Sequence, residues 1–149
     1  MGNATIAPGH DETDDDVRKL TMAGLAALHE RMAGDDHCDA ALAGFARPRV
    51  LHEPLRALVR AQHLLLQAEH DVERVADVLR RDQKYAPAGR PSIHIVQLRK
   101  QQAAARQVML VARQRLAQAA QTFVQASGLP VKAGQTPSTA AATWLQSLG

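Results

Sequence analysis

Aromatic residues are scarce in this chain, and their scarcity narrows the choice of fold. Among 149 residues there are two phenylalanines, one tyrosine and one tryptophan. Hydrophobic residues still make up 46% of the sequence, and most of them are alanine, leucine or valine. Small aliphatic side chains suit closely packed helices, whereas strands favour aromatic and β-branched residues. The shortage of rings also argues against a surface that stacks the bases of single-stranded nucleic acid.

Cysteine, long apolar runs and phosphate-binding glycine motifs are also missing or nearly so. Cys38 is the only cysteine, which excludes an internal disulfide and fits a reducing compartment. No apolar run reaches the roughly 18 residues of a transmembrane helix, and the first residues lack the pattern of a classical secretory signal. No glycine-rich nucleotide-binding loop is present. We therefore expect no cofactor and no small-molecule substrate.

The most regular stretch is 91–128, where a pattern repeats every seven residues. Its first register contains Ile95, Gln102, Met109, Leu116 and Phe123. The register three residues later contains Leu98, Ala105, Ala112, Ala119 and Ala126. This spacing places both registers on one stripe of an α-helix about 50 Å long. Ser92 is the expected cap at its start, and Gly128 is expected to end it.

A second heptad stretch begins at Pro54, the expected first helical residue, and runs to about residue 84. Its first register starts at Leu51, just before the helix, and continues with Leu58, Leu65, Val72 and Leu79; its second contains Leu55, Gln62, Glu69 and Ala76. The short connection to 91–128 predicts an antiparallel hairpin. Folding at the turn places Leu79 opposite Ile95. Each seven-residue step away from the turn then places the next two register positions opposite each other, as far as Leu51 and Phe123. In the second register, large residues then face alanines, which lets the two helices approach closely.

Three polar residues interrupt the seam of this hairpin: Gln62, Glu69 and Gln102. We interpret them as residues that limit slippage between the two helices, at some cost in stability. Glu69 is predicted to lie within reach of Arg106. Catalysis by this acid is the less favoured interpretation, because no second acid is placed beside it.

The rest of the chain predicts shorter helices. A helix over 13–33 would be capped by Thr13, with Asp14, Asp15 and Asp16 in its first turn. Asp35 or Asp36 could cap a second helix that ends before Pro48, and Ser138 could cap a last one. We therefore predict an all-α fold, an elongated bundle of about four main helices plus a short C-terminal helix. The expected segments are a flexible 1–12, a helical bundle over 13–127, and a loose 128–149.

Metal binding and catalysis find little support in the sequence. His63 and His70 are seven residues apart, about 10 Å along a helix, and neither Leu66 nor Gln67 between them is a good ligand. We interpret both histidines as solvated surface residues. His37 and Cys38 are neighbours that would not face each other on a helix, so Cys38 is predicted to be a buried thiol rather than a nucleophile.

Basic charge gathers at the predicted turn of the hairpin. Residues 1–46 carry nine acids and three bases, whereas 47–149 carry fifteen bases and six acids. The candidate anion- or lipid-binding residues at the turn are Arg80, Arg81, Lys84, Tyr85 and Arg90. A solvated helix end whose bases complement the helix dipole would explain these charges. A site for phospholipid headgroups or nucleic-acid phosphate is the less favoured alternative.

The long helix over 91–128 carries a second apolar stripe, about 100° round from the first. It contains the candidate partner-binding residues Val96, Ala103, Leu110, Ala117 and Val124. One interpretation is that one of the first two helices packs on this stripe. The other is that the stripe is a groove for self-association or for a protein partner.

These features predict a non-enzymatic interaction or scaffolding module that binds a protein partner or itself as a homo-oligomer. The alternative is a peripheral membrane-targeting module whose basic hairpin end binds anionic phospholipid headgroups. In fold alone, such a bundle resembles the membrane-targeting domains of bacterial toxins and secreted effectors. Nucleic acid is less favoured, because no short helix-turn-helix is evident. The expected location is the cytoplasm, with the membrane periphery or delivery by a secretion system as alternatives.

Overall fold

The computed structural model describes residues 20–86, 89 and 92–148 of the chain. Over these residues the fold is all-α, with five α-helices, one short 3₁₀ helix and no strand, as predicted. The flexible segment predicted for 1–12 and the helix start predicted at 13–16 lie outside the described residues. The same holds for Arg90 at the hairpin turn.

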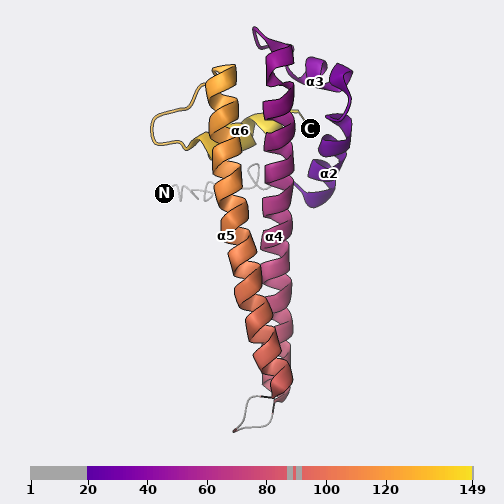
Figure 1. Cartoon of the computed structure of the whole chain (residues 1–149), viewed down its shortest axis with the longest axis vertical. Coiled ribbons are helices and arrows are strands. Elements are labelled where there is room, and N and C mark those ends of the chain that lie inside the picture. The colour runs from indigo at the N-terminus through magenta and orange to yellow at the C-terminus, as the bar shows by residue number, and fades with distance from the viewer. Residues whose placement is uncertain (1–19, 87–88, 90–91, 149) are drawn as a thin grey trace, which may run out of the picture.

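Two long antiparallel helices form the axis of the molecule (Figure 1). They are α4 (His52–Tyr85) and α5 (Ile93–Ser127), each about 50 Å long. The side chain of Ser92 accepts a hydrogen bond from the backbone N–H of Ile95 at 3.2 Å, so this residue caps α5 as predicted. Gly128 has φ of 70°, a left-handed conformation that favours glycine and ends the helix. The predicted hairpin and both limits of α5 are confirmed.

The seam between α4 and α5 follows the predicted heptads but is unevenly buried. Its buried members are Leu55, Leu58, Leu65, Leu79, Ile95, Leu98, Ala112, Leu116 and Phe123. Near the middle of the hairpin, Val72, Ala76 and Gln102 are only half-buried. In the described part of the chain, no third helix packs on this part of the hairpin, in agreement with its incomplete burial. We call it the stalk, and it consists of 69–85 of α4 and 93–105 of α5.

The other helices gather at the end of the hairpin opposite its turn (Figure 1). There α2 (Met22–Arg31) and α3 (Asp35–Ala41) pack on α4, and α6 (Pro137–Gln146) packs on α5. A 3₁₀ helix, η1 (Pro48–Leu51), leads into α4. These elements enclose the main hydrophobic core, whereas a smaller cluster of Leu79, Ile95 and Leu98 lies near the turn. The molecule therefore has a globular head on a two-helix stalk.

Several predicted helix starts are wrong, and at Thr21 and Thr136 a side-chain cap sets the observed start. The helix predicted over 13–33 does not run continuously, since Thr21 has extended backbone and its side chain accepts from Gly24 N–H at 3.0 Å to cap α2. Gly34, not Asp35 or Asp36, precedes α3, so both acids lie in its first turn. In the same way Thr136, not Ser138, caps α6. In α4, Pro54 is the third residue, because the chain already turns helically through η1.

Three aromatic rings join α6 to the end of the hairpin. Phe123 is fully buried, and its ring centroid lies 6.1 Å from that of Phe45 and 4.9 Å from that of Trp144. Phe45 and Trp144 meet edge to face at 5.5 Å. Leu145 of α6 is also buried in the main core. The C-terminal helix is thus part of the head, and three of the four aromatic residues of the chain meet at one point.

Candidate interaction surfaces

Four of the five residues predicted at the basic end lie in the last turns of α4, namely Arg80, Arg81, Lys84 and Tyr85, and their charges are partly paired. Arg80 forms an ion pair with Asp77 one turn earlier, and Arg81 Nε lies 3.7 Å from a carboxylate oxygen of Asp82. Lys84 Nζ lies 5.9 Å from the centre of the Tyr85 ring, a cation–π distance. Asp77 and Asp82 therefore offset part of the positive charge at this end of the hairpin.

This end of the hairpin is held together by a polar contact that the sequence interpretation missed and by the predicted contact between Leu79 and Ile95. His94 Nε2 of α5 lies 2.6 Å from a carboxylate oxygen of Asp82 in α4, which joins the two helices across the turn. Directly below, Leu79 packs with Ile95 and Leu98 in the smaller core cluster. The sequence contained a signal for this pair, because an acid near the end of α4 and a histidine in the first turn of α5 flank the predicted turn.

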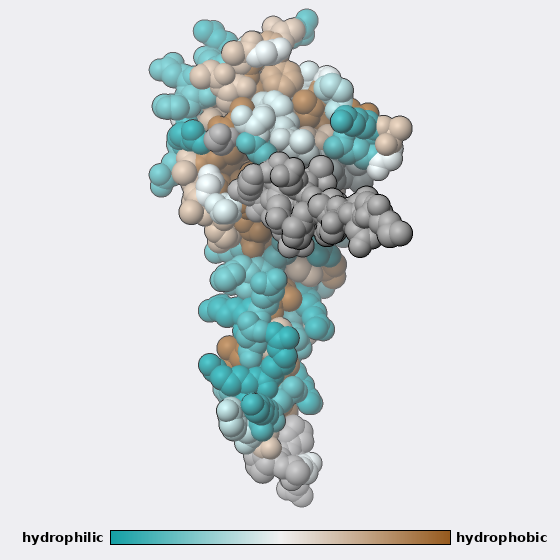
Figure 2. Space-filling view, turned by 180° about the vertical axis from the view of Figure 1, so that it is seen from behind, coloured by the Kyte–Doolittle hydropathy of each residue, from teal (hydrophilic) through white to brown (hydrophobic). Residues whose placement is uncertain are grey.

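Two large hydrophobic side chains are exposed beside these charges. Tyr85 is 77% exposed and Ile93 is 80% exposed. They lie at the last residue of α4 and the first residue of α5, so the turn brings them to the same end of the molecule. On the face shown in Figure 2, the stalk above this end is mostly hydrophilic with isolated hydrophobic patches. The tip thus combines basic and apolar groups on a largely polar stalk.

The second stripe of α5 is open over most of its length. Leu110 is 49% exposed, Val96 is 39% exposed, and Ala103 and Ala117 are exposed as well. Only Val124, at the head end near α6, is half-buried. The described parts of the first two helices do not cover this stripe, because α2 and α3 pack on α4 instead.

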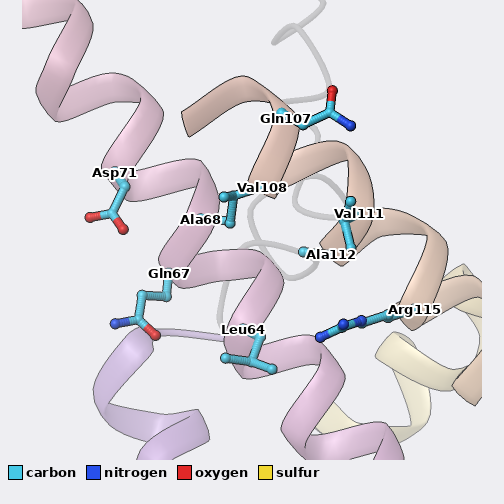
Figure 3. A pocket seen from close by; sticks show the side chains of 9 residues that line it. All are labelled: Leu64, Gln67, Ala68, Asp71, Gln107, Val108, Val111, Ala112 and Arg115. Atoms are coloured by element: carbon cyan, nitrogen blue, oxygen red, sulfur yellow. The ribbon is translucent and has the colours of Figure 1, made fainter. Parts of the chain in front are cut away.

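A groove between α4 and α5 forms a further candidate surface that the heptad analysis did not identify (Figure 3). Its volume is about 370 Å³, and its lining residues are Leu64, Gln67, Ala68, Asp71, Gln107, Val108, Val111, Ala112 and Arg115. Val108 is 60% exposed and Leu64 is 41% exposed. A shallower depression of about 310 Å³ continues it toward the head and shares Leu64, Ala112 and Arg115. The signal missed in the sequence was the pair Val108 and Val111, which belongs to neither predicted stripe.

A polar cluster fixes α3 against the start of α4. His52 Nε2 lies 2.7 Å from a carboxylate oxygen of Asp39, and an Arg56 terminal nitrogen lies 2.6 Å from one of Asp35. Arg56 Nε also donates to the carbonyl of Met32 at 2.7 Å. The hydrogen bond and the positive charge of Arg56 hold the pKa of Asp35 below its usual value of 3.8. These contacts orient α3 and satisfy the carbonyl at the C-terminus of α2.

The lowered pKa of Asp35 predicts a stability difference that depends on pH. The unfolded chain binds a proton at Asp35 more readily than the folded chain does. The stabilisation is therefore complete above pH 3.8 and is lost as the pH falls through the lower folded-state pKa. Urea midpoints should show Asp35→Asn less stable than the wild type at neutral pH and equal to it in strong acid. Asp36→Asn is the matched control, and a pH-independent difference for Asp35→Asn would contradict the ion pair.

The remaining candidates for chemistry are held in structural contacts. Cys38 is buried, its thiol donates to the carbonyl of Met32 at 3.1 Å, and burial raises its pKa, which disfavours the thiolate. His63 was predicted to be solvated, but it is half-buried with its ring centroid 6.5 Å from that of His29, because α2 packs beside it. Across 20–86 and 92–148, no group of three or more His, Cys, Asp or Glu residues could hold a metal ion.

Two further predictions concern the contact of Glu69 with Arg106 and the absence of a transmembrane helix. Glu69 is half-buried in the seam, but no ion pair joins it to Arg106, although both residues are described. That Arg106 lies within reach of Glu69 stays a prediction. None of the helices in the described part of the chain has an apolar stretch long enough to span a bilayer.

Comparisons of the chain with protein-family models, with curated proteins and with solved structures found no match.

Proposed function

We propose that this chain is an interaction module that binds a protein partner or a second copy of itself through the exposed side of its helical hairpin. The observation that carries the proposal is the open second stripe of α5. Leu110 and Val96 remain about half exposed on a helix whose other face is well packed. Contiguous exposed apolar surface on a soluble domain is typical of a docking site.

The shape of the molecule supports the same proposal. The head contains the main core and holds both long helices in place, so α5 can keep the side chains of its second stripe exposed. An exposed stripe along a rigid helix offers side chains at regular helical spacing to a partner helix. The buried protonated thiol of Cys38 is better suited to packing than to nucleophilic chemistry.

A charge placed on the stripe tests the proposal. Leu110→Glu should abolish capture of the partner from the native cell extract, or dissociate a self-assembled form, without lowering the helical signal. Leu110 is half exposed, so the added charge stays solvated in the free protein. Gln101→Glu is the matched control, since this exposed residue lies nine positions away and on the opposite side of α5. Equal binding by the wild type and Leu110→Glu would show that the second stripe of α5 is not the docking site.

The exposed apolar residues at the basic end support membrane docking as a second candidate function. Tyr85 and Ile93 would enter the headgroup region while Lys84 and its neighbours meet anionic lipid. Each base near an anionic leaflet contributes about 1 kcal/mol, and the attraction weakens with added salt.

Sedimentation with liposomes tests this second candidate. The chain should bind anionic vesicles at low salt, release them at high salt and ignore neutral vesicles. The variant with glutamine at all four basic positions of the turn should lose binding and keep its helical signal; these positions are Arg80, Arg81, Lys84 and Arg90. Failure of the unmodified chain to bind anionic vesicles at low salt would rule the membrane function out.

A further inference from the structure

The groove between α4 and α5 has opposite charges at its two ends and apolar side chains between them. Asp71 lies at the end nearer the hairpin turn, and its side chain is 47% exposed. Arg115 lies toward the head, where it shares the adjoining depression with Ala61 and Leu64. Val108 and Val111 complete the apolar centre. The same surface therefore carries an acid, a hydrophobic centre and a base in order along the hairpin.

The charged residues are separated along the hairpin axis by about two helical turns. Arg115 lines both depressions beside Leu64, and Asp71 is seven residues from Leu64 along α4, a distance of about 10 Å. In Figure 3, Arg115 extends from α5 toward Leu64, whereas Asp71 points away from α5. The two charges are thus placed at opposite ends of the groove, and the structure gives no ion pair between them.

This order makes the surface complementary to itself. A two-fold axis through the apolar centre would place the acid end of one molecule against the basic end of the other, twice over. Interfaces with two-fold symmetry require this relation, in which residue i of one copy meets residue j of the other and the reverse. Asp71 has one neighbour of opposite charge, Arg74 at 3.5 Å, in an exposed pair of small energetic value. Asp71 therefore remains available to a second molecule.

We infer that a second copy of this chain docks antiparallel on this groove, with Asp71 of each copy facing Arg115 of the other and the apolar centres of Leu64, Val108 and Val111 in contact. The inference rests on the proposed interaction function, adds a second surface of the hairpin to it and names the partner that this surface binds. The opposite charges of Asp71 and Arg115 favour a second copy of this chain over a different protein. A second copy matches both charges through two-fold symmetry, whereas a different protein has no such requirement. α2 and α3 lie on another side of α4, at Val59 and Arg56, so they leave this face open.

Charge reversal of the full-length chain tests the inference, with sedimentation equilibrium over a range of concentrations as the measurement. The wild type should form a dimer. Asp71→Arg or Arg115→Asp alone should raise the dimer Kd by about tenfold or more, since each places two pairs of like charges in the interface. The double variant, Asp71→Arg with Arg115→Asp, should restore the dimer because both pairs form again with reversed sign. Asp77→Arg, an exposed acid outside the groove, is the control and should leave the Kd unchanged.

The outcomes separate this inference from the proposed function. A wild type that stays monomeric at every concentration overturns the dimer, although a partner captured through the second stripe would still support the proposed function. A dimer lost in Leu110→Glu but unaffected by either reversal at Asp71 or Arg115 also overturns the inference, because the stripe would then hold the copies together. Single variants that weaken the dimer without rescue in the double variant overturn the antiparallel arrangement. The helical signal of each variant shows that it remains folded, as expected for exposed positions.

Discussion

Phe123→Ala is expected to lower the free energy of unfolding by about 3–5 kcal/mol, the usual cost of removing a buried phenylalanine ring. Phe123 is fully buried where α5, α6 and the segment after α3 meet. Its ring contacts Phe45 edge to face and lies 4.9 Å from Trp144, so truncation removes contacts to both partners. The head has no other large aromatic side chain among its described residues to fill the cavity.

Urea unfolding monitored by circular dichroism measures this effect, and the fluorescence of Trp144 reports whether α6 stays docked. Phe123→Leu is the matched variant, because it keeps most of the apolar volume and loses only the aromatic geometry. Its cost should be clearly smaller, with aromatic pairs contributing about 0.5–1.5 kcal/mol beyond the buried area. Equal losses in the two variants would mean that the aromatic contacts, rather than the filled volume, hold the head together.

Leu65→Ala is expected to cost about 2–5 kcal/mol, because it opens a cavity in the seam between the long helices. Leu65 belongs to the main core and is nearly fully buried, and Met109 of α5 packs against the same core. The site is enclosed by two rigid helices, so it cannot collapse easily around the missing atoms. The urea midpoint of unfolding measures the loss.

His70→Ala is the control for Leu65→Ala, since it lies on the same helix five residues later and is exposed. Its cost should stay below about 0.5 kcal/mol, the usual range for surface substitutions. A loss at His70 as large as that at Leu65 would mean that the buried face of α4 has been wrongly assigned.

The hairpin could be predicted from the sequence because its information is periodic and local. Leu58, Leu65 and Leu79 recur at the heptad spacing and are all buried against α5. Ser92 and Gly128 carry the start and stop signals of α5 in their own side chain or backbone. A helix only has to repeat the same local hydrogen bonds, so its limits and its apolar face can be read from one segment at a time.

The positions of the short helices could not be predicted in the same way. Their apolar faces are too short to specify which side of the hairpin they cover, and polar contacts between segments decide the matter. Arg56 joins α4 to Asp35 and to the end of α2, while His52 joins it to Asp39. Ala120, outside both predicted registers, is fully buried in the main core.

The sequence by itself determined that this chain is an all-α protein built on a long antiparallel hairpin with a basic turn, because heptads and turn residues act locally. Only the tertiary structure decided which surfaces remain open. α2 and α3 pack on α4, and this leaves the Leu110 stripe bare and exposes the groove at Leu64 and Val108. The exposure of a helix face depends on which distant segments pack against it, and the residue pattern within one helix does not specify this.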